Sequence, residues 1–138
     1  MNDGAAPLLM LPGTVADERV FSPVLERLGV ASLSMRLSGA TSTAAMARLI
    51  LAEAPERFAL CGFSLGSIVA LEVVAQAPER IERLALLGCN ARALPVDKAA
   101  ARRATVPVAE RDGITSYIDN VWDASVPRHR RDDASLRT

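Results

Sequence analysis

The sequence predicts an α/β fold in which a doubly wound, mainly parallel sheet of about four strands precedes a helical segment. Short, continuous apolar runs suit strands that are buried on both faces, as the strands of parallel sheets are. Apolar residues at helical spacing lie between these runs, and proline or glycine residues mark the segment ends. This alternation of strands and helices implies right-handed crossovers, with helices on both faces of the sheet.

The first strand and helix are marked by local signals. Residues 8–11 are an uninterrupted run of leucine and methionine that ends at a Pro-Gly pair. The first helix is predicted to begin at Ser22, a good N-cap residue followed by proline, and to stop at Gly29. Residues 30–37 alternate weakly between apolar and polar side chains and are predicted to form the second strand.

The second helix and third strand follow the same pattern. Thr41, Ser42 or Thr43 can cap a helix that ends at Pro55. Residues 57–62 are then predicted to form the third strand.

A third helix and a fourth strand complete the predicted core. Residues 67–77 are apolar nearly all round, so we expect this helix to be buried on most sides. Pro78 closes the helix, and residues 83–88 form the fourth strand. Without a further strand beside it, this strand would leave an apolar sheet edge, so we expect self-association through that edge.

The character of the chain changes after Asn90, where helical patterns replace the apolar strands. Helices are predicted over residues 97–104 and 114–122, and another begins at residue 128 and is cut short by the end of the chain. We therefore expect two parts, a core over residues 1–90 and a helical segment over residues 91–138.

Composition narrows the classes of function. The 138 residues include 16 basic and 16 acidic side chains, so the net charge of zero argues against a nucleic-acid partner. Cys61 and Cys89 end apolar runs, which favours buried free thiols in a reduced, cytoplasmic protein. The sequence shows no signal peptide and no apolar run of membrane-spanning length. Neither metal-ligand spacing nor a dinucleotide fingerprint is present, so no cofactor or metal is predicted.

The motif Gly62-x-Ser64-x-Gly66 carries the main chemical signal. A predicted buried strand ends at its first glycine and a predicted buried helix begins just after its serine. A turn this tight leaves little room for flanking side chains and holds the serine hydroxyl near a helix N-terminus, where a developing oxyanion is stabilised. The alternative interpretation is a helix-capping serine, with glycines that serve packing.

With this motif in this context, the chain resembles the α/β-hydrolase family. The resemblance implies that Ser64 is the catalytic nucleophile and that the backbone N–H groups of Leu65 and Thr14 form the oxyanion hole. Many members begin the Thr14 loop with His-Gly, whereas this chain has Pro-Gly; since Pro12 has no N–H, the donor is Thr14 or Val15. The implied substrate is a small-molecule ester, thioester or related acyl compound, and residues 91–138 resemble the helical cap of many members.

The same resemblance implies an acid and a histidine that follow later strands, and this chain ends before either strand. Its single histidine, His129, lies in a charged segment and is expected to be solvent-exposed. Asn90, at an alternative position of the family's acid, has no carboxylate. The remaining candidates are expected to be solvated charges of the helical segment; they are Asp112, Asp119, Asp123, Asp132 and Asp133.

Three functional hypotheses remain open at this level. The chain is the N-terminal part of a serine hydrolase, or a truncated, non-catalytic relative that acts as a binding module, or a minimal enzyme in which His129 pairs with Ser64. Tyr117 and Trp122 are expected to be packing residues, with the lining of a pocket as the alternative.

Overall fold

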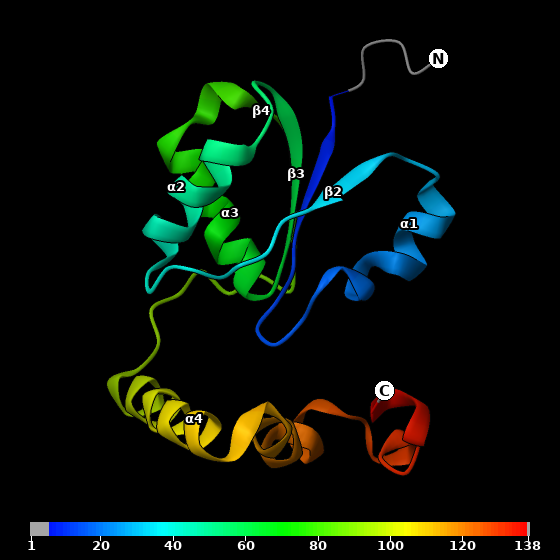
Figure 1. Cartoon of the computed structure of the whole chain (residues 1–138), viewed down its shortest axis with the longest axis vertical. Coiled ribbons are helices and arrows are strands. Elements are labelled where there is room, and N and C mark those ends of the chain that lie inside the picture. The colour runs from blue at the N-terminus through cyan, green and yellow to red at the C-terminus, as the bar shows by residue number, and fades with distance from the viewer. Residues whose placement is uncertain (1–5, 138) are drawn as a thin grey trace. The chain divides into compact units, whose positions relative to one another are not determined.

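The computed structural model describes residues 6–137, and the chain divides into two compact units between Ala91 and Arg92. The first unit contains a four-stranded sheet of order β2-β1-β3-β4, in which every pair is parallel. This confirms the predicted fold class (Figure 1). The strands are β1 (Leu8–Leu11), β2 (Ser32–Ser34), β3 (Phe58–Phe63) and β4 (Ile81–Leu87), and the α-helices are α1 (Ser22–Leu28), α2 (Thr43–Glu53) and α3 (Leu65–Gln76).

Helices cover both faces of this sheet, with α2 and α3 on one side and α1 on the other (Figure 1). Alternate residues of the central strands point to opposite faces. Leu9 and Leu60 pack into the larger core, which α2 and α3 complete with Ile50, Val69 and other buried residues. On the opposite face a smaller core is made by Met10, Phe21 and Cys61.

Helix α1 begins differently from the prediction. Ser22 was expected to be its N-cap, but Ser22 is the first helical residue and Phe21 is the N-cap. The reason is a 3-10 turn, Glu18–Phe21, which runs directly into α1 and is itself capped by the Asp17 side chain. The predicted end is correct, since Gly29 adopts a left-handed φ of 59°.

Strand β2 is shorter than predicted. Residues 30–37 were expected to be extended, and only Ser32–Ser34 pair as a strand. Its last paired residue, Ser34, lies opposite Met10 of the four-residue β1, and Pro12, two residues further along, has no N–H to extend the ladder. Helix α2 beyond it is capped by Ser42, one of the three predicted residues, whose hydroxyl accepts from the Ala45 N–H at 3.2 Å.

The Arg80 side chain connects the C-terminal end of α2 to the start of β4 by hydrogen bonds. It lies in a 3-10 turn, Pro78–Arg80, that leads into β4. Its guanidinium donates to the backbone carbonyls of Leu51, Ala54, Pro55 and Glu56 at 2.7–3.2 Å. It also lies 5.7 Å from the centre of the Phe58 ring. The terminal carbonyls of α2, which lack intrahelical donors, are satisfied in this way.

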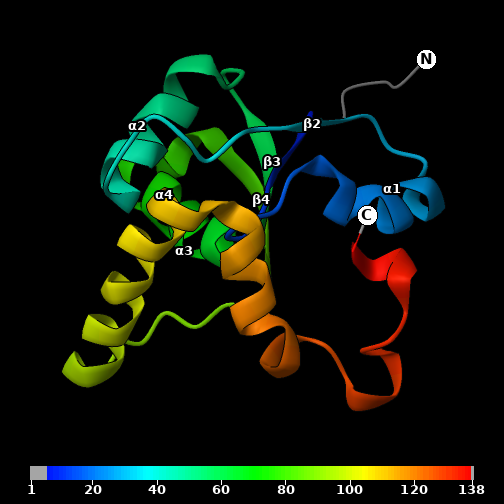
Figure 2. The ribbon, with the colours of Figure 1, turned by 60° about the horizontal axis from the view of Figure 1, so that its bottom comes forward.

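The second unit is mainly helical, but its predicted segments differ in detail. Helix α4 (Val96–Ser125) includes both helices that were expected separately, and Gly113, with φ of 83° and ψ of 167°, interrupts it. Figure 2 shows the change of direction along α4. Among the residues with described side chains in this unit, Trp122 is the buried one, and its indole N–H donates to the Arg131 carbonyl.

The prediction that a continuous helix begins at residue 128 is wrong. The chain instead forms two 3-10 turns, Arg128–Arg130 and Ala134–Arg137. The Arg131 side chain connects this segment to the end of α4 by donating to the carbonyls of Val126 and Asp123, and the Asp133 carboxylate accepts from the N–H and hydroxyl of Ser135. Within residues 6–137, no helix combines the length and apolar character needed to cross a membrane.

Candidate functional site

Ser64 occupies a one-residue turn between a strand and a helix. Strand β3 ends at Phe63, and α3 begins at Leu65. Ser64 is exposed and has φ of 53° and ψ of −114°, a conformation that residues other than glycine rarely adopt. A strained residue of this kind persists only where the surrounding structure holds it.

The two glycines of the motif are required by close packing. A Cβ atom on Gly62 would overlap the Gly66 carbonyl and would come 2.7 Å from the Cα atom of Ser67. A Cβ atom on Gly66 would overlap the Leu11 carbonyl of β1. These glycines therefore allow β3, α3 and β1 to approach each other directly at the turn.

The helix-capping interpretation of the serine is wrong. Ser64 stands at the N-cap position of α3, but its side chain makes no capping hydrogen bond. A capping serine would accept a bond from an N–H group in the first turn of the helix. The hydroxyl is therefore not used to stabilise α3.

Hydrogen bonds from the backbone of Ser64 and from a second serine, Ser67, hold the turn. The Ser64 N–H donates to the Leu87 carbonyl at 2.9 Å, and the Ser67 N–H donates to the Ser64 carbonyl at 3.0 Å. The Ser67 hydroxyl lies 2.7 Å from the Gly62 carbonyl oxygen and 3.0 Å from that of Leu87. Sequence reasoning missed Ser67, although a polar residue at the start of an otherwise apolar helix was the available signal.

The turn lies at the point where the strand order of the sheet reverses. From β1 the chain crosses to β2 at one edge, and from β3 it crosses to β4 at the other edge. The loops that follow adjacent strands β1 and β3 therefore lead to opposite edges of the sheet. In doubly wound sheets the reversal point is the usual place for a ligand.

The loop after β1 meets the Ser64 turn. A Cβ atom on Gly13 would lie 3.2 Å from the Ser64 Cβ atom and 3.2 Å from the Phe63 ring, so the two segments are in contact. Thr14 follows Gly13 directly and is exposed, and Val15 has a φ of 55°. Leu65 is the first residue of α3, so its N–H belongs to the first-turn donors without an intrahelical acceptor.

The candidates for an acid and a base are distributed over both units. Asn90 is exposed and follows β4 in the first unit, whereas His129 is exposed and lies in the turn Arg128–Arg130 of the second unit. All five aspartates named above belong to the second unit. The carboxylate of Asp133 accepts bonds from Ser135 and Arg130, which lower its pKa to about 2.

The two cysteines are free thiols. Cys61 is buried, as predicted, and burial raises the pKa of its thiol, which keeps it protonated. Cys89 is half-buried, which departs from the expectation of full burial. Among the side chains described, no group of three or more His, Cys, Asp or Glu residues is arranged to hold a metal ion.

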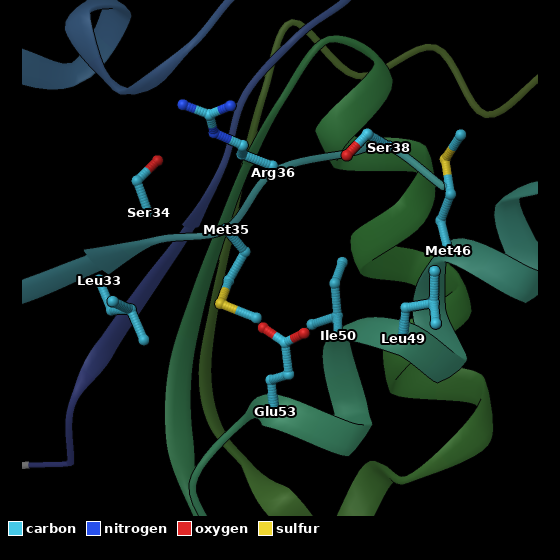
Figure 3. Close-up of a pocket in the computed structure, with 9 residues that line it drawn as sticks. All are labelled: Leu33, Ser34, Met35, Arg36, Ser38, Met46, Leu49, Ile50 and Glu53. Carbon is cyan, nitrogen blue, oxygen red and sulfur yellow. The ribbon is translucent and has the colours of Figure 1, made fainter. Parts of the chain in front are cut away.

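A separate cavity of about 440 Å³ lies between β2 and α2. Its wall is mostly apolar, with Met35, Met46 and Ile50, and it carries the charged side chains of Arg36 and Glu53 (Figure 3). None of its lining residues belongs to the Ser64 motif or to the loop after β1. The cavity is therefore distinct from the candidate site.

The chain is similar over part of its length to an ester-hydrolysing enzyme. That relative is the pimeloyl-[acyl-carrier protein] methyl ester esterase of Pectobacterium carotovorum subsp. carotovorum, with 48% identity over 46 residues. The aligned part is 33% of this chain and 18% of the relative, so it spans less than a fifth of that protein. No protein-family model matches the chain. This similarity and the parallel sheet are consistent with the resemblance to α/β-hydrolases.

Proposed function

We propose that the chain carries the nucleophile-bearing part of an α/β-hydrolase that acts on carboxylic esters, thioesters or related acyl compounds. The observation that carries the proposal is the conformation of Ser64. A positive φ at an exposed serine, between a buried strand and an apolar helix, holds a hydroxyl that does not cap that helix. A sharp strand-to-helix turn with a strained serine is what a nucleophile elbow requires, and this supports the proposal.

The proposed reaction proceeds through an acyl-enzyme. The Ser64 Oγ atom attacks the substrate carbonyl while a base takes the hydroxyl proton. The N–H groups of Leu65 and of Thr14 or Val15 then stabilise the oxyanion of the tetrahedral intermediate. Collapse of the intermediate expels the alcohol or thiol, which receives the proton from the base. Water then attacks the acyl-enzyme and regenerates the Ser64 hydroxyl.

Two sources of the base are proposed, and they are distinguishable by experiment. In the first, the base is a histidine outside residues 1–138. The order of catalytic residues in the family that the chain resembles implies this source. In the second, His129 supplies the base and forms a dyad with Ser64. The exposed position of His129 in a charged turn favours the first source.

The test is labelling by a fluorophosphonate probe, which reacts with an activated serine. Where a base is within reach of Ser64, we expect an adduct on the peptide that contains Ser64, complete loss of the adduct in Ser64→Ala, and unchanged labelling in the control Ser38→Ala. Ser38 is an exposed serine outside the motif. If His129 is the base, His129→Ala abolishes labelling; if labelling survives in His129→Ala, the dyad is excluded.

A second candidate is a non-catalytic binding module with the same fold. The observation that favours it is that the single histidine of the sequence belongs to the second unit, so the unit that contains Ser64 has no histidine of its own. Such a protein would melt cooperatively but would not react with the probe. A folded chain of residues 1–138 without any Ser64 adduct would therefore reject the His129 dyad, and absence of the adduct when the outside histidine is also present would reject the hydrolase proposal and leave the binding module.

A further inference from the structure

We propose that Ser67 is a positioning residue for Ser64, and that its hydroxyl holds the strained turn by joining the ends of β3 and β4. The inference rests on the proposed function only where it treats Ser64 as a nucleophile. The structural part, that Ser67 fixes the backbone of the turn, stands independently of any activity.

The burial of Ser67 sets it apart from the other polar side chains. Its exposed fraction is 0%, and it is the buried polar residue of the part of the chain that the structure describes. A buried hydroxyl is costly unless it is hydrogen-bonded. Here the cost is offset by two carbonyl oxygens within reach, those of Gly62 at 2.7 Å and Leu87 at 3.0 Å.

These two carbonyls lie on either side of the Ser64 turn. Gly62 precedes Ser64 by two residues in β3, while Leu87 is the last residue of β4. The Leu87 oxygen also accepts the Ser64 N–H at 2.9 Å, so its two lone pairs serve Ser64 and Ser67 together. Ser67 therefore stands where the end of β3, the first turn of α3 and the end of β4 meet, and its single hydroxyl proton is shared between the carbonyls of the two strands.

The packing of α3 does not require this hydroxyl. The helix is held in the core by Val69, Ala70 and Val73, each with an exposed fraction of 0%. Loss of the Ser67 hydroxyl would leave those apolar contacts intact but would remove a donor from the turn. The effect is therefore expected at Ser64 and not along the whole helix.

The first experiment measures amide hydrogen exchange by NMR in the wild type, Ser67→Ala and Ser67→Cys. The Ser64 amide reports directly on the link to β4, because its N–H donates to Leu87. We expect Ser67→Ala to increase its exchange rate by about tenfold, the effect of losing one hydrogen bond. Ser67→Cys retains a weak donor of similar size and should give an intermediate rate.

The matched control is Val73→Ala, which removes buried side-chain atoms from the same helix, farther from the turn. It should lower global stability without a selective change at the Ser64 amide. If the exchange rate of the Ser64 amide, relative to the other amides, changes equally in Ser67→Ala and Val73→Ala, the positioning role of Ser67 is overturned. If Ser67→Ala does not fold, the exchange rate of the Ser64 amide is compared between Ser67→Cys and Val73→Ala. Equal relative changes in these two variants would again overturn the positioning role.

The second experiment measures the rate of fluorophosphonate labelling in the same variants. We expect labelling of Ser64 to fall about tenfold in Ser67→Ala and to be unchanged in Val73→Ala, because misplacement of a nucleophile lowers its rate of attack. A selective change of exchange with no labelling in any variant supports Ser67 as the residue that holds the turn and rejects an activated Ser64 in residues 1–138 alone. A selective change of exchange with undiminished labelling overturns the role of Ser67 in nucleophile placement.

Discussion

Val15 and Ser64 are the non-glycine residues with positive φ within the described part of the chain. Each lies just after a strand at the reversal point of the sheet, Val15 after β1 and Ser64 after β3. Val15 is β-branched and 47% exposed, so burial of its side chain does not account for its φ of 55°. Strain of this kind is characteristic of functional sites.

Val15→Gly tests whether this strain is stored for function. We expect the free energy of unfolding in urea to be unchanged or raised by up to about 1 kcal/mol, since glycine adopts positive φ without a steric penalty. Labelling of Ser64 should become slower, because the loop that carries the proposed oxyanion donor loses its fixed direction.

The control for Val15→Gly is Val20→Gly. Val20 is similarly exposed, at 41%, but lies in the 3-10 turn Glu18–Phe21 without positive φ. It should lose roughly 0.5–1 kcal/mol of stability. Equal destabilisation of the two variants would show that Val15 is not strained.

At the scale of elements, α2 has no left-handed glycine cap at its C-terminus and depends on a residue distant in sequence. Its C-cap is Ala54 in an extended conformation, and Arg80, ahead of β4, supplies the donors. The crossover from α2 to β3 and the start of β4 are joined by this one side chain. Since β4 ends at Leu87, which binds Ser64, the connection also supports the strand that holds the candidate site.

Substitution of Arg80 should therefore destabilise the first unit. We expect Arg80→Ala to lower the free energy of unfolding by about 2–3 kcal/mol, because several part-buried carbonyls lose a charged donor. Arg80→Lys should recover only a part of this, since one ammonium group cannot reach carbonyls that a planar guanidinium reaches at once. Urea denaturation gives both values.

Arg57→Ala provides the control for Arg80. Arg57 forms an exposed ion pair with Glu82 at 3.0 Å, and its side chain is 63% exposed. Such pairs contribute about 0–1 kcal/mol, so this variant should remain close to the wild type. Wild-type stability of Arg80→Lys would contradict the proposed arrangement of donors.

At the scale of the whole molecule, the open edge of the sheet is the main exposed feature of the first unit. Strand β4 pairs with β3 on one side, and within the described residues no strand pairs with its other side. Leu84 and Leu87 on this strand are 41% and 45% exposed. A seven-residue edge that is apolar except for Glu82 and Arg83 favours pairing with another strand.

We therefore expect the isolated chain to self-associate through β4. Sedimentation velocity should show species larger than a monomer in increasing proportion as concentration rises. Leu84→Lys should reduce this association, because a charged side chain disfavours pairing at an edge. Leu28→Lys, at a 56% exposed leucine of α1, is the control and should leave the association unchanged. A monomer at all concentrations would contradict the role of the edge.

The sequence by itself determined the features that depend on neighbouring residues. The run Leu8–Leu11, the helix over 67–77 and the break at Gly29 were predictable because burial pattern and backbone preference are local properties. The Gly62-x-Ser64-x-Gly66 motif was found in the same way, since its context is a strand and a helix that adjoin it directly.

Tertiary structure decided the features that depend on partners distant in the chain. Strand β2 pairs with β1 over Ser32–Ser34, and the segment after residue 127 is held by the Arg131 side chain, which donates to the carbonyls of Asp123 and Val126. The roles of Ser67 and Arg80 were not predictable, because the carbonyls they bind come from strands and helices that only folding brings together. The sequence therefore determined the serine that we propose as nucleophile, while the tertiary structure determined how its backbone is held.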